Sequence, residues 1–326
     1  MMTTTESNFL LGLPNDLLRS LMVNWITLCD LAQLDSALCN HDLRSKLSQI
    51  IYTMHCVYSA PSLLQAEVVN QNVFDNFQSW ALFKKIKLDT FFLSSTTLEN
   101  VELRESLVHQ CIGPHTVRIT VFTARLREHP EFFVKLMNNI LCKCQNLLYF
   151  GAPTDPGQKL RRIFPEIALL CSNLQEICLP HTVITNEIIV SLMKCNALSV
   201  LITNAHRSTA VCDALLLAIP RWPQSKEFSI PLLKLSNACV EALANHCPHL
   251  ACLNVEFDEQ CFEAVQKLAK CCDGLECIGD ESVINEEQQL KIYGMLPNLT
   301  AIHLPGYLSE QSLCTLLPHL PHIKRM

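Results

Sequence analysis

Glycine and charge are both scarce in this chain. Only 8 of the 326 residues are glycine, and Asp, Glu, Lys and Arg together make up 17%. A nucleotide-binding loop needs closely spaced glycines, and no GxGxxG or GKS/GKT motif occurs. A disordered chain combines low hydrophobicity with high charge, whereas 49% of this chain is apolar. The composition therefore predicts a folded protein with a large core and argues against nucleotide binding.

Long apolar runs and basic runs are missing too. The longest apolar stretches, such as residues 214–219, are far shorter than the ~20 residues that span a bilayer. The first nine residues hold no Lys or Arg and do not resemble a secretory signal. The net charge is -6, and the most basic stretch, residues 83–87, is short, which disfavours nucleic-acid binding. We therefore expect a soluble protein of the cytoplasm, with the nucleus as an alternative, that binds neither membrane nor nucleic acid.

What the chain does have is a repeat. One phrase recurs: Cys or Leu, two variable residues, Leu, two more residues and then an apolar residue. Its anchor leucines are Leu147, Leu174, Leu198, Leu250, Leu275, Leu299 and Leu320. They lie 21 to 27 residues apart, except for a gap of 52 after Leu198 that fits two repeats of 26. A period of about 20–29 residues is typical of leucine-rich repeats, so we predict a degraded repeat near residues 222–230.

A helix-like segment precedes each phrase. In residues 236–246 the side chains of Cys239, Val240, Leu243 and Ala244 form one apolar stripe, and Ser236 stands at the N-cap position. Residues 186–193, 259–270 and 286–295 follow the same pattern. Each repeat is thus predicted to be a helix, a tight turn and a strand, and stacked repeats share one core. Residues 87–93 and 115–122 are predicted to be strands that start the parallel sheet.

The repeat also explains many of the 18 cysteines. Five of them stand at the turn from helix to strand, where a small apolar residue fits between neighbouring repeats: Cys144, Cys171, Cys195, Cys247 and Cys272. A disulfide scaffold is typical of a short secreted chain. Structural zinc sites are commonly built from paired C-x₂-C clusters, which do not occur. We therefore expect neither disulfides nor a metal nor any other cofactor.

No arrangement of residues points to catalysis. The G-x-S-x-G motif of a nucleophilic serine is absent. The acidic pairs Asp258-Glu259, Asp280-Glu281 and Glu286-Glu287 fall in turns or at predicted helix starts, where carboxylates complement the helix dipole. We predict that the protein is not an enzyme and has no catalytic residues.

The repeats resemble the cysteine-containing subclass of leucine-rich repeats, which is common in F-box proteins. The segment LSNACVEALANHCPHLACLNV, residues 235–255, shows the resemblance best. It covers the chain from about residue 88 to the C-terminus. The resemblance implies an α/β leucine-rich-repeat solenoid, a curved parallel sheet with outer helices, of about eight to ten repeats.

The N-terminal segment contains three short amphipathic helical patterns and resembles an F-box. The matching residues are Leu13, Pro14, Leu17, Leu18, Trp25, Asp30, Leu31, Leu34 and Cys39. The tryptophan that often follows the cysteine in that family is absent, and residues 40–44 read NHDLR instead. The resemblance implies that a ligase adaptor binds Leu13, Pro14, Leu17, Leu18, Trp25, Leu31 and Leu34. The alternative is a helical cap that only seals the end of the solenoid.

These patterns predict three regions and one binding face. The regions are an F-box-like helical domain (1–55), a connecting or capping region (56–84) and the solenoid (85–326). Strand residues between the buried apolar ones are expected on the concave surface, either as a partner face or as ordinary solvated positions. They are Tyr149, Glu176, Cys178, Cys252, Asn254, Glu256, Cys277, Ala301 and His303.

The resemblance also implies a function. F-box proteins with leucine-rich repeats are substrate-recognition subunits of cullin-RING (SCF-type) ubiquitin ligases, so the expected partners are a protein substrate, the adaptor subunit and a cullin. The alternative is a leucine-rich-repeat adaptor or scaffold that has no link to a ligase.

Overall fold

The computed structural model describes residues 44–45, 82, 88, 90–93, 101–121, 130–152, 162–205, 208–279, 294–296, 298–303 and 324. These residues belong to two compact units. The first contains the described residues up to Val121 and the segment Cys142–Leu147. The second contains most of helix α9 (Pro130–Lys143) and the described residues from Leu148 onward. Each compact unit is built from strands that alternate with helices.

The first compact unit holds the start of the sheet. Strand β1 (Thr90–Leu93) pairs in parallel with strand β2 (Arg118–Val121), and helix α8 (Val101–Gln110) connects them. Both strands lie inside the segments that the sequence predicted. The Thr116 hydroxyl donates a 2.6 Å hydrogen bond to the Leu88 carbonyl, and Lys143 Nζ donates one of 2.9 Å to the Val108 carbonyl. These bonds fix the turn into β2 and the end of α8.

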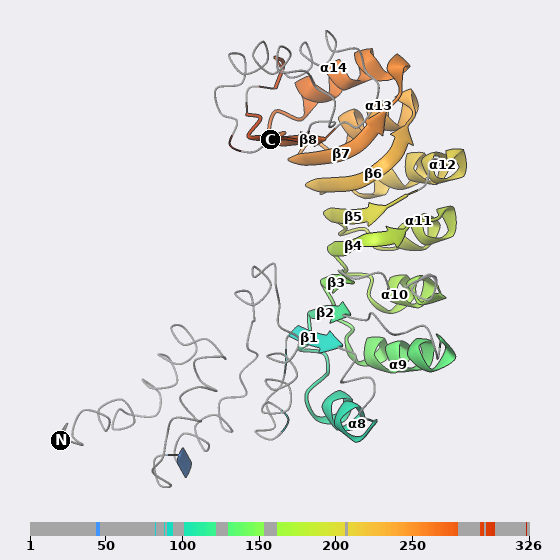
Figure 1. Ribbon diagram of the computed structural model, residues 1–326, viewed down its shortest axis with the longest axis vertical. Coiled ribbons are helices and arrows are strands. Elements are labelled where there is room, and N and C mark those ends of the chain that lie inside the picture. The colour runs from blue at the N-terminus through green and yellow to red at the C-terminus, as the bar shows by residue number, and fades with distance from the viewer. Residues whose placement is uncertain are drawn as a thin grey trace, which may run out of the picture. The chain divides into compact units, whose positions relative to one another are not determined.

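The second compact unit is a series of helix–strand repeats (Figure 1). Its strands are β3 (Tyr149–Gly151), β4 (Glu176–Val183), β5 (Val200–Asn204), β6 (Glu227–Leu235), β7 (Cys252–Phe257), β8 (Cys277–Gly279) and β9 (Ala301–His303). Its helices are α9 (Pro130–Lys143), α10 (Phe164–Leu170), α11 (Asn186–Leu192), α12 (Thr209–Ala218), α13 (Asn237–His246) and α14 (Phe262–Cys271), with 3-10 turns η2 (Ile219–Arg221) and η3 (Glu259–Cys261). Each strand pairs in parallel with the next one along the chain. This is the alternation predicted for a leucine-rich-repeat solenoid.

The recurrent phrase forms the turn from each helix into the next strand. At each turn the amide three residues after the anchor cysteine donates to that cysteine's carbonyl, as from Leu174 to Cys171 (3.1 Å) and from Leu275 to Cys272 (3.1 Å). The five anchor cysteines are at most 1% exposed. The thiols of Cys195, Cys247 and Cys272 each point to the anchor carbonyl of the preceding repeat, at 3.9, 3.6 and 3.2 Å. The predicted role of these cysteines in packing between repeats is confirmed.

The degraded repeat lies where the spacing predicted it. Trp222 takes the position of the anchor cysteine, and the Ser225 amide donates to its carbonyl at 3.0 Å, as an anchor leucine does in the other repeats. The Trp222 side chain is 1% exposed, and its indole Nε1 has no hydrogen-bond partner. Five other repeats carry a small cysteine and then a large leucine at these two positions, whereas this repeat carries the large Trp222 and then the small Ser225. The turn is kept, but the Cys-x-x-Leu signature is lost from the sequence.

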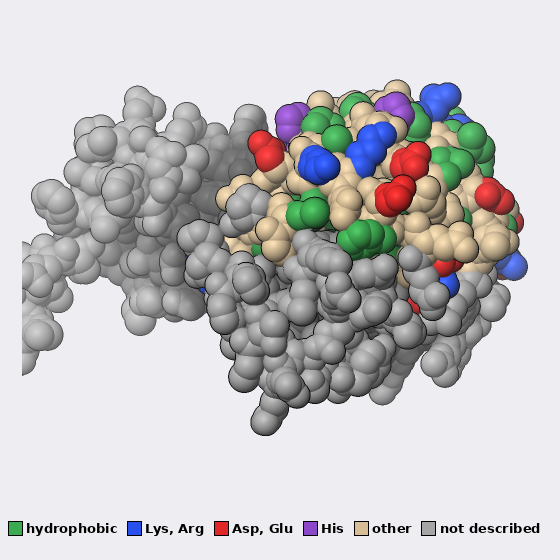
Figure 2. All heavy atoms as spheres, turned by 90° about the horizontal axis from the view of Figure 1, so that it is seen from above, with side chains coloured by type: hydrophobic (Ala, Val, Ile, Leu, Met, Phe, Trp, Pro, Cys, Tyr) green, Lys and Arg blue, Asp and Glu red, His purple; other side chains and the backbone are tan. Residues whose placement is uncertain are grey.

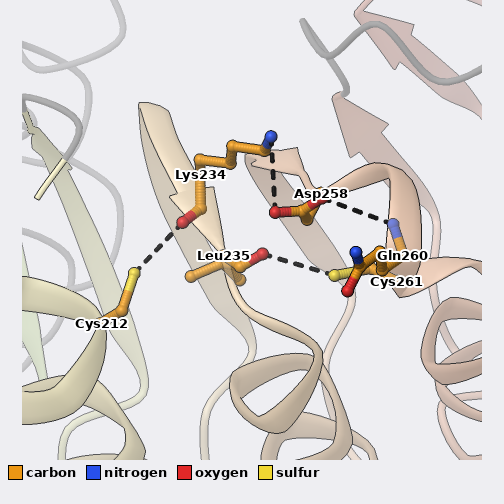
Figure 3. Close-up of polar contacts among 6 residues, drawn as sticks. All are labelled: Cys212, Lys234, Leu235, Asp258, Gln260 and Cys261. Carbon is orange, nitrogen blue, oxygen red and sulfur yellow. Dashed lines mark hydrogen bonds and ion pairs between the residues drawn. The ribbon is translucent and has the colours of Figure 1, made fainter. Parts of the chain in front are cut away.

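A second set of thiols binds the carboxyl end of β6 (Figure 3). Cys212 of α12 donates to the Lys234 carbonyl at 3.1 Å, and Cys261 of η3 donates to the Leu235 carbonyl at 3.4 Å. The Asp258 carboxylate lies 3.4 Å from Lys234 Nζ and accepts from the Gln260 amide at 3.4 Å. Both ends of this ion pair are well exposed, so it contributes little to stability.

Strands β4 and β6 are longer than their neighbours and each contains an irregularity. Register shifts fall between Leu179 and Val183 in β4 and between Ser229 and Lys234 in β6. Pro180 and Pro231 lie inside these stretches and cannot donate to the ladder. In β6 the strain is visible at Leu232, which has a φ of 66° and is the one non-glycine residue with positive φ among the described residues.

The burial of the anchor cysteines leads to a prediction about thiol reactivity. Burial raises the pKa to about 12 for Cys144 and Cys247, and to about 11 for Cys195 and Cys272. Since the thiolate is the nucleophile, we expect these four thiols to react with iodoacetamide at pH 8 at least about a hundredfold more slowly than the exposed Cys142 and Cys271. Peptide mass spectrometry of a labelling time course would measure this. Equal rates in the folded chain would contradict the burial.

Candidate partner-binding face

Two rows of residues flank a buried row on the strands of the second compact unit. Row one consists of Tyr149, Glu176, Val200, Glu227, Cys252, Cys277 and Ala301, which are in register. Row two consists of Gly151, Cys178, Ile202, Ser229, Asn254, Gly279 and His303. We call the two rows together the strand face. Row one is half-buried throughout, while the row between is buried: Phe150, Ile177, Leu201, Phe228, Leu253 and Ile278.

At its β3–β4 end the strand face presents a phenol and a thiol. A Cβ added at Gly151 would lie 2.8 Å from Tyr149 Cε1, so the Tyr149 ring lies over this glycine. Burial raises the pKa of the Cys178 thiol, and a hydrogen bond with Tyr149 partly offsets this rise. Gly151 is therefore needed for the close approach of the ring, which places an aromatic surface and a hydroxyl beside Cys178.

The strand face is acidic. Its described side chains include the carboxylates of Glu176 and Glu227 and no Lys or Arg. Burial, and secondarily the like charge of Glu176, raises the pKa of Glu227. The Glu176 carboxylate therefore disfavours the ionised form of Glu227, and a cation placed between the two would relieve this cost. The arrangement suits a basic or hydrogen-bond-donating group on a partner.

The raised pKa of Glu227 predicts a pH-dependent effect of its removal. A carboxyl with a higher pKa in the folded than in the unfolded chain stabilises the fold at low pH, and this stability is lost as pH rises through the folded value. We therefore expect Glu227→Gln to be slightly more stable than the parent protein at pH 7, with the difference vanishing below about pH 4. Thermal melts across this range would measure it, with Glu263→Gln on the exposed side of α14 as the control. A Glu227→Gln variant that is less stable at pH 7 would contradict the assignment.

One residue predicted for this face is not on its surface. Glu256 was expected to be exposed by alternation, but its side chain is 3% exposed. The prediction is wrong because the alternation ends at Val255: the last three residues of β7 are all buried. Here the longer strand β6 resumes pairing after its register shift, with Lys234 opposite Glu256. A one-residue alternation rule cannot anticipate such a shift.

The other predicted positions can be placed as follows. The structure puts Tyr149, Glu176, Cys178, Cys252, Asn254, Cys277 and Ala301 on the strand face, half-buried. His303 belongs to β9, but its side chain lies outside the described residues, as do Leu13, Pro14, Leu17, Leu18, Trp25, Leu31 and Leu34 of the predicted adaptor site. Sequence reasoning missed Val200, Ile202, Glu227 and Ser229. The last two follow the degraded repeat, and placing Phe228 in the register of Leu253 would have found them.

The remaining described surface is mixed in character. On the face seen in Figure 2, acidic, basic and histidine side chains lie among apolar ones. No group of three or more His, Cys, Asp or Glu side chains in the described segments is close enough to hold a metal ion. All the cysteines that the structure describes are free thiols. None of the described helices has the length and apolar character needed to cross a membrane.

Comparison with known proteins adds little. No family model matches the chain, and no curated protein matches it. Among solved structures, the chain is similar to the leucine-rich-repeat-containing protein LegL7 from Legionella pneumophila, with a TM-score of 0.38 and 10% sequence identity. That match covers 74% of this chain and 82% of the other.

Proposed function

We propose that the protein is a non-enzymatic protein-binding module that holds its partner on the strand face. The observation that supports this is the continuity of row one, which runs in register across β3 to β9 and leaves its side chains partly accessible. Repeat proteins of this architecture commonly bind partners along an extended sheet surface. The mixed supply of phenol, carboxylate, amide and thiol groups suits a protein surface rather than one small molecule.

The charge of the strand face favours a partner of a particular kind. Glu176 and Glu227 are acidic and partly desolvated, and Asn254 and Ser229 are joined by a hydrogen bond of 3.3 Å. A partner segment with Lys or Arg would neutralise the carboxylates, and its polar groups would compete for the amide and hydroxyl. We therefore propose a basic segment of a protein as the ligand of this face.

A more specific proposal for the bound partner is that the protein recognises substrates for a cullin-RING ubiquitin ligase. It rests on the F-box resemblance of residues 13–39, with Leu17, Leu18 and Trp25 in contact with the adaptor subunit. In this proposal the N-terminal segment binds the adaptor and the strand face binds the substrate, in the cytoplasm or nucleus. The alternative is a scaffold whose N-terminal segment only caps the repeats.

Affinity purification with two variants separates these roles. Asn254→Arg adds a cation to the strand face, and Gln266→Arg adds a cation at a half-buried position of α14. We expect the first to lose the bound partner and the second to retain it, as quantified by mass spectrometry of the co-purified proteins. A partner that is retained or lost equally by both variants would overturn the strand-face proposal.

A second pair of variants tests the link to the ligase. Leu17→Ser combined with Leu18→Ser removes two apolar contacts that the F-box resemblance assigns to the adaptor, and Arg19→Ser is the neighbouring control. We expect the parent and the control to co-purify a cullin with its adaptor, and the double variant to lose both while it stays folded. If the parent protein brings down neither, the scaffold alternative replaces the ligase proposal.

A further inference from the structure

Two thiols lie next to each other in row one of the strand face. Cys252 is the first residue of β7 and Cys277 the first residue of β8, and the two are direct partners in the parallel register. Adjacent strands run about 4.7–4.9 Å apart, and a disulfide joins Cα atoms that are about 4.4–6.8 Å apart. The backbone therefore already holds these cysteines at a separation that a disulfide can span.

The two thiols differ from the other described cysteines in their surroundings. Anchor thiols such as Cys247 and Cys272 are buried and point to backbone carbonyls. Cys252 and Cys277 are only partly buried, so a small reagent can reach them, and their side chains are within hydrogen-bonding reach of each other. No other pair among the described cysteines combines direct strand pairing with access from outside.

The surroundings of Cys252 favour its protonated form. The hydrogen bond with Cys277, and secondarily burial, raises the pKa of Cys252, and the carboxylate of Glu227 on the adjacent strand β6 acts in the same direction. Cys252 therefore keeps its proton and can donate it toward the sulfur of Cys277. This arrangement supplies one sulfur that attacks an oxidant and a neighbouring thiol that resolves the product.

We propose that Cys252 and Cys277 form a dithiol modification site that a hydroperoxide converts into a disulfide. The Cys277 sulfur attacks the terminal peroxide oxygen and the O–O bond breaks. The leaving oxygen takes up the proton that the Cys277 thiol releases and departs as an alcohol, which leaves a sulfenic acid on Cys277. The Cys252 sulfur then attacks the sulfenic sulfur, and the hydroxyl leaves as water with the proton of Cys252. Two thiols lose two electrons in total, and the hydroperoxide gains them. This site is independent of whether the strand face binds a partner.

The chain offers a direct test. The full-length protein is treated with tert-butyl hydroperoxide, free thiols are alkylated, and a tryptic digest is analysed by mass spectrometry. We expect a linked peptide that joins residues 235–267 to residues 271–291, and fragment ions that place the bridge at Cys252 and Cys277. Dithiothreitol should remove it. Because fragment ions locate the bridge in the parent protein, this readout does not depend on any variant folding.

Variants provide the control. Cys252→Ser and Cys277→Ser should each reduce the linked peptide by at least about tenfold, whereas Cys271→Ser, which removes the exposed thiol of the same tryptic peptide, should leave it unchanged. A link that persists in either of the first two variants, a bridge mapped to Cys271 or Cys272, or oxidation that stops at separate sulfinic acids would each overturn the proposal.

Discussion

Trp222→Cys should be severely destabilising, although it restores the residue that five other repeats carry at this position. The Trp222 side chain is 1% exposed and is among the largest fully buried side chains in the described chain. Removing most of its volume leaves a cavity that costs about 3 kcal/mol or more. Chemical denaturation followed by circular dichroism would show the loss as a lower midpoint. A conservative change, Trp222→Phe, should cost less than about 1.5 kcal/mol, because the indole Nε1 has no partner to lose.

A second substitution, at Ser225, tests whether Trp222 and Ser225 together replace the cysteine and leucine of those five repeats. Ser225 occupies the position of an anchor leucine and is buried, so Ser225→Leu alone should overpack the turn and cost about 1–3 kcal/mol. In the double variant the new leucine fills space that the tryptophan left. We expect the double variant to be more stable than the sum of the two single effects by at least about 1 kcal/mol. Simple additivity in this cycle would contradict the equivalence of the two residue pairs.

Leu250→Asp should prevent the second compact unit from folding around β7. The Leu250 side chain is 0% exposed, and its amide closes the turn by donating to the Cys247 carbonyl at 3.2 Å. A carboxylate at this position would be buried without a cation, which places the cost above about 4 kcal/mol. We expect loss of soluble yield and of hydrogen-exchange protection in β7 and β8.

The adjacent residue is a matched control for this change. His249 is exposed at the same turn, so His249→Asp introduces the same side chain one position earlier and should leave stability within about 0.5 kcal/mol of the parent. If the two aspartate variants behaved alike, the register of the repeat would be wrong, because that register alone separates the buried position from the exposed one.

Most of the fold could be predicted from the regular spacing of the anchor residues in the sequence. This spacing predicted the helices in residues 186–193 and 236–246, the parallel order of the strands, the burial of Cys171 and Cys247, and the place of the degraded repeat. The helix predicted for residues 286–295 lies largely outside the described residues. The confirmed predictions succeed because each repeat must bury the same face against its neighbours, so the same positions must be apolar. The N-cap is one local example: the Ser236 side chain accepts from the Cys239 amide at 3.4 Å, as the sequence predicted.

Prediction failed where neighbouring repeats differ in length. The irregular stretches around Pro180 and Pro231 shift the register, and η3 replaces the first turn predicted for α14. Each proline was visible in the sequence and signals an interrupted ladder. How the next strand resumes pairing depends on tertiary contacts, which is why Glu256 could not be placed by alternation. The adaptor site stays a prediction because its residues lie outside those that the structure describes.

Parallel pairing between successive repeats also determines how this part of the chain can reach its folded state. Each strand from β3 to β9 finds its hydrogen-bond partners one repeat away, as Cys252 does in Cys277, so no pairing step has to bring distant parts of the chain together. Loop-closure entropy is then nearly the same at each step, and the sheet can grow in either direction from an interior nucleus. Trp222, the largest fully buried side chain among the described residues, belongs to such an interior repeat.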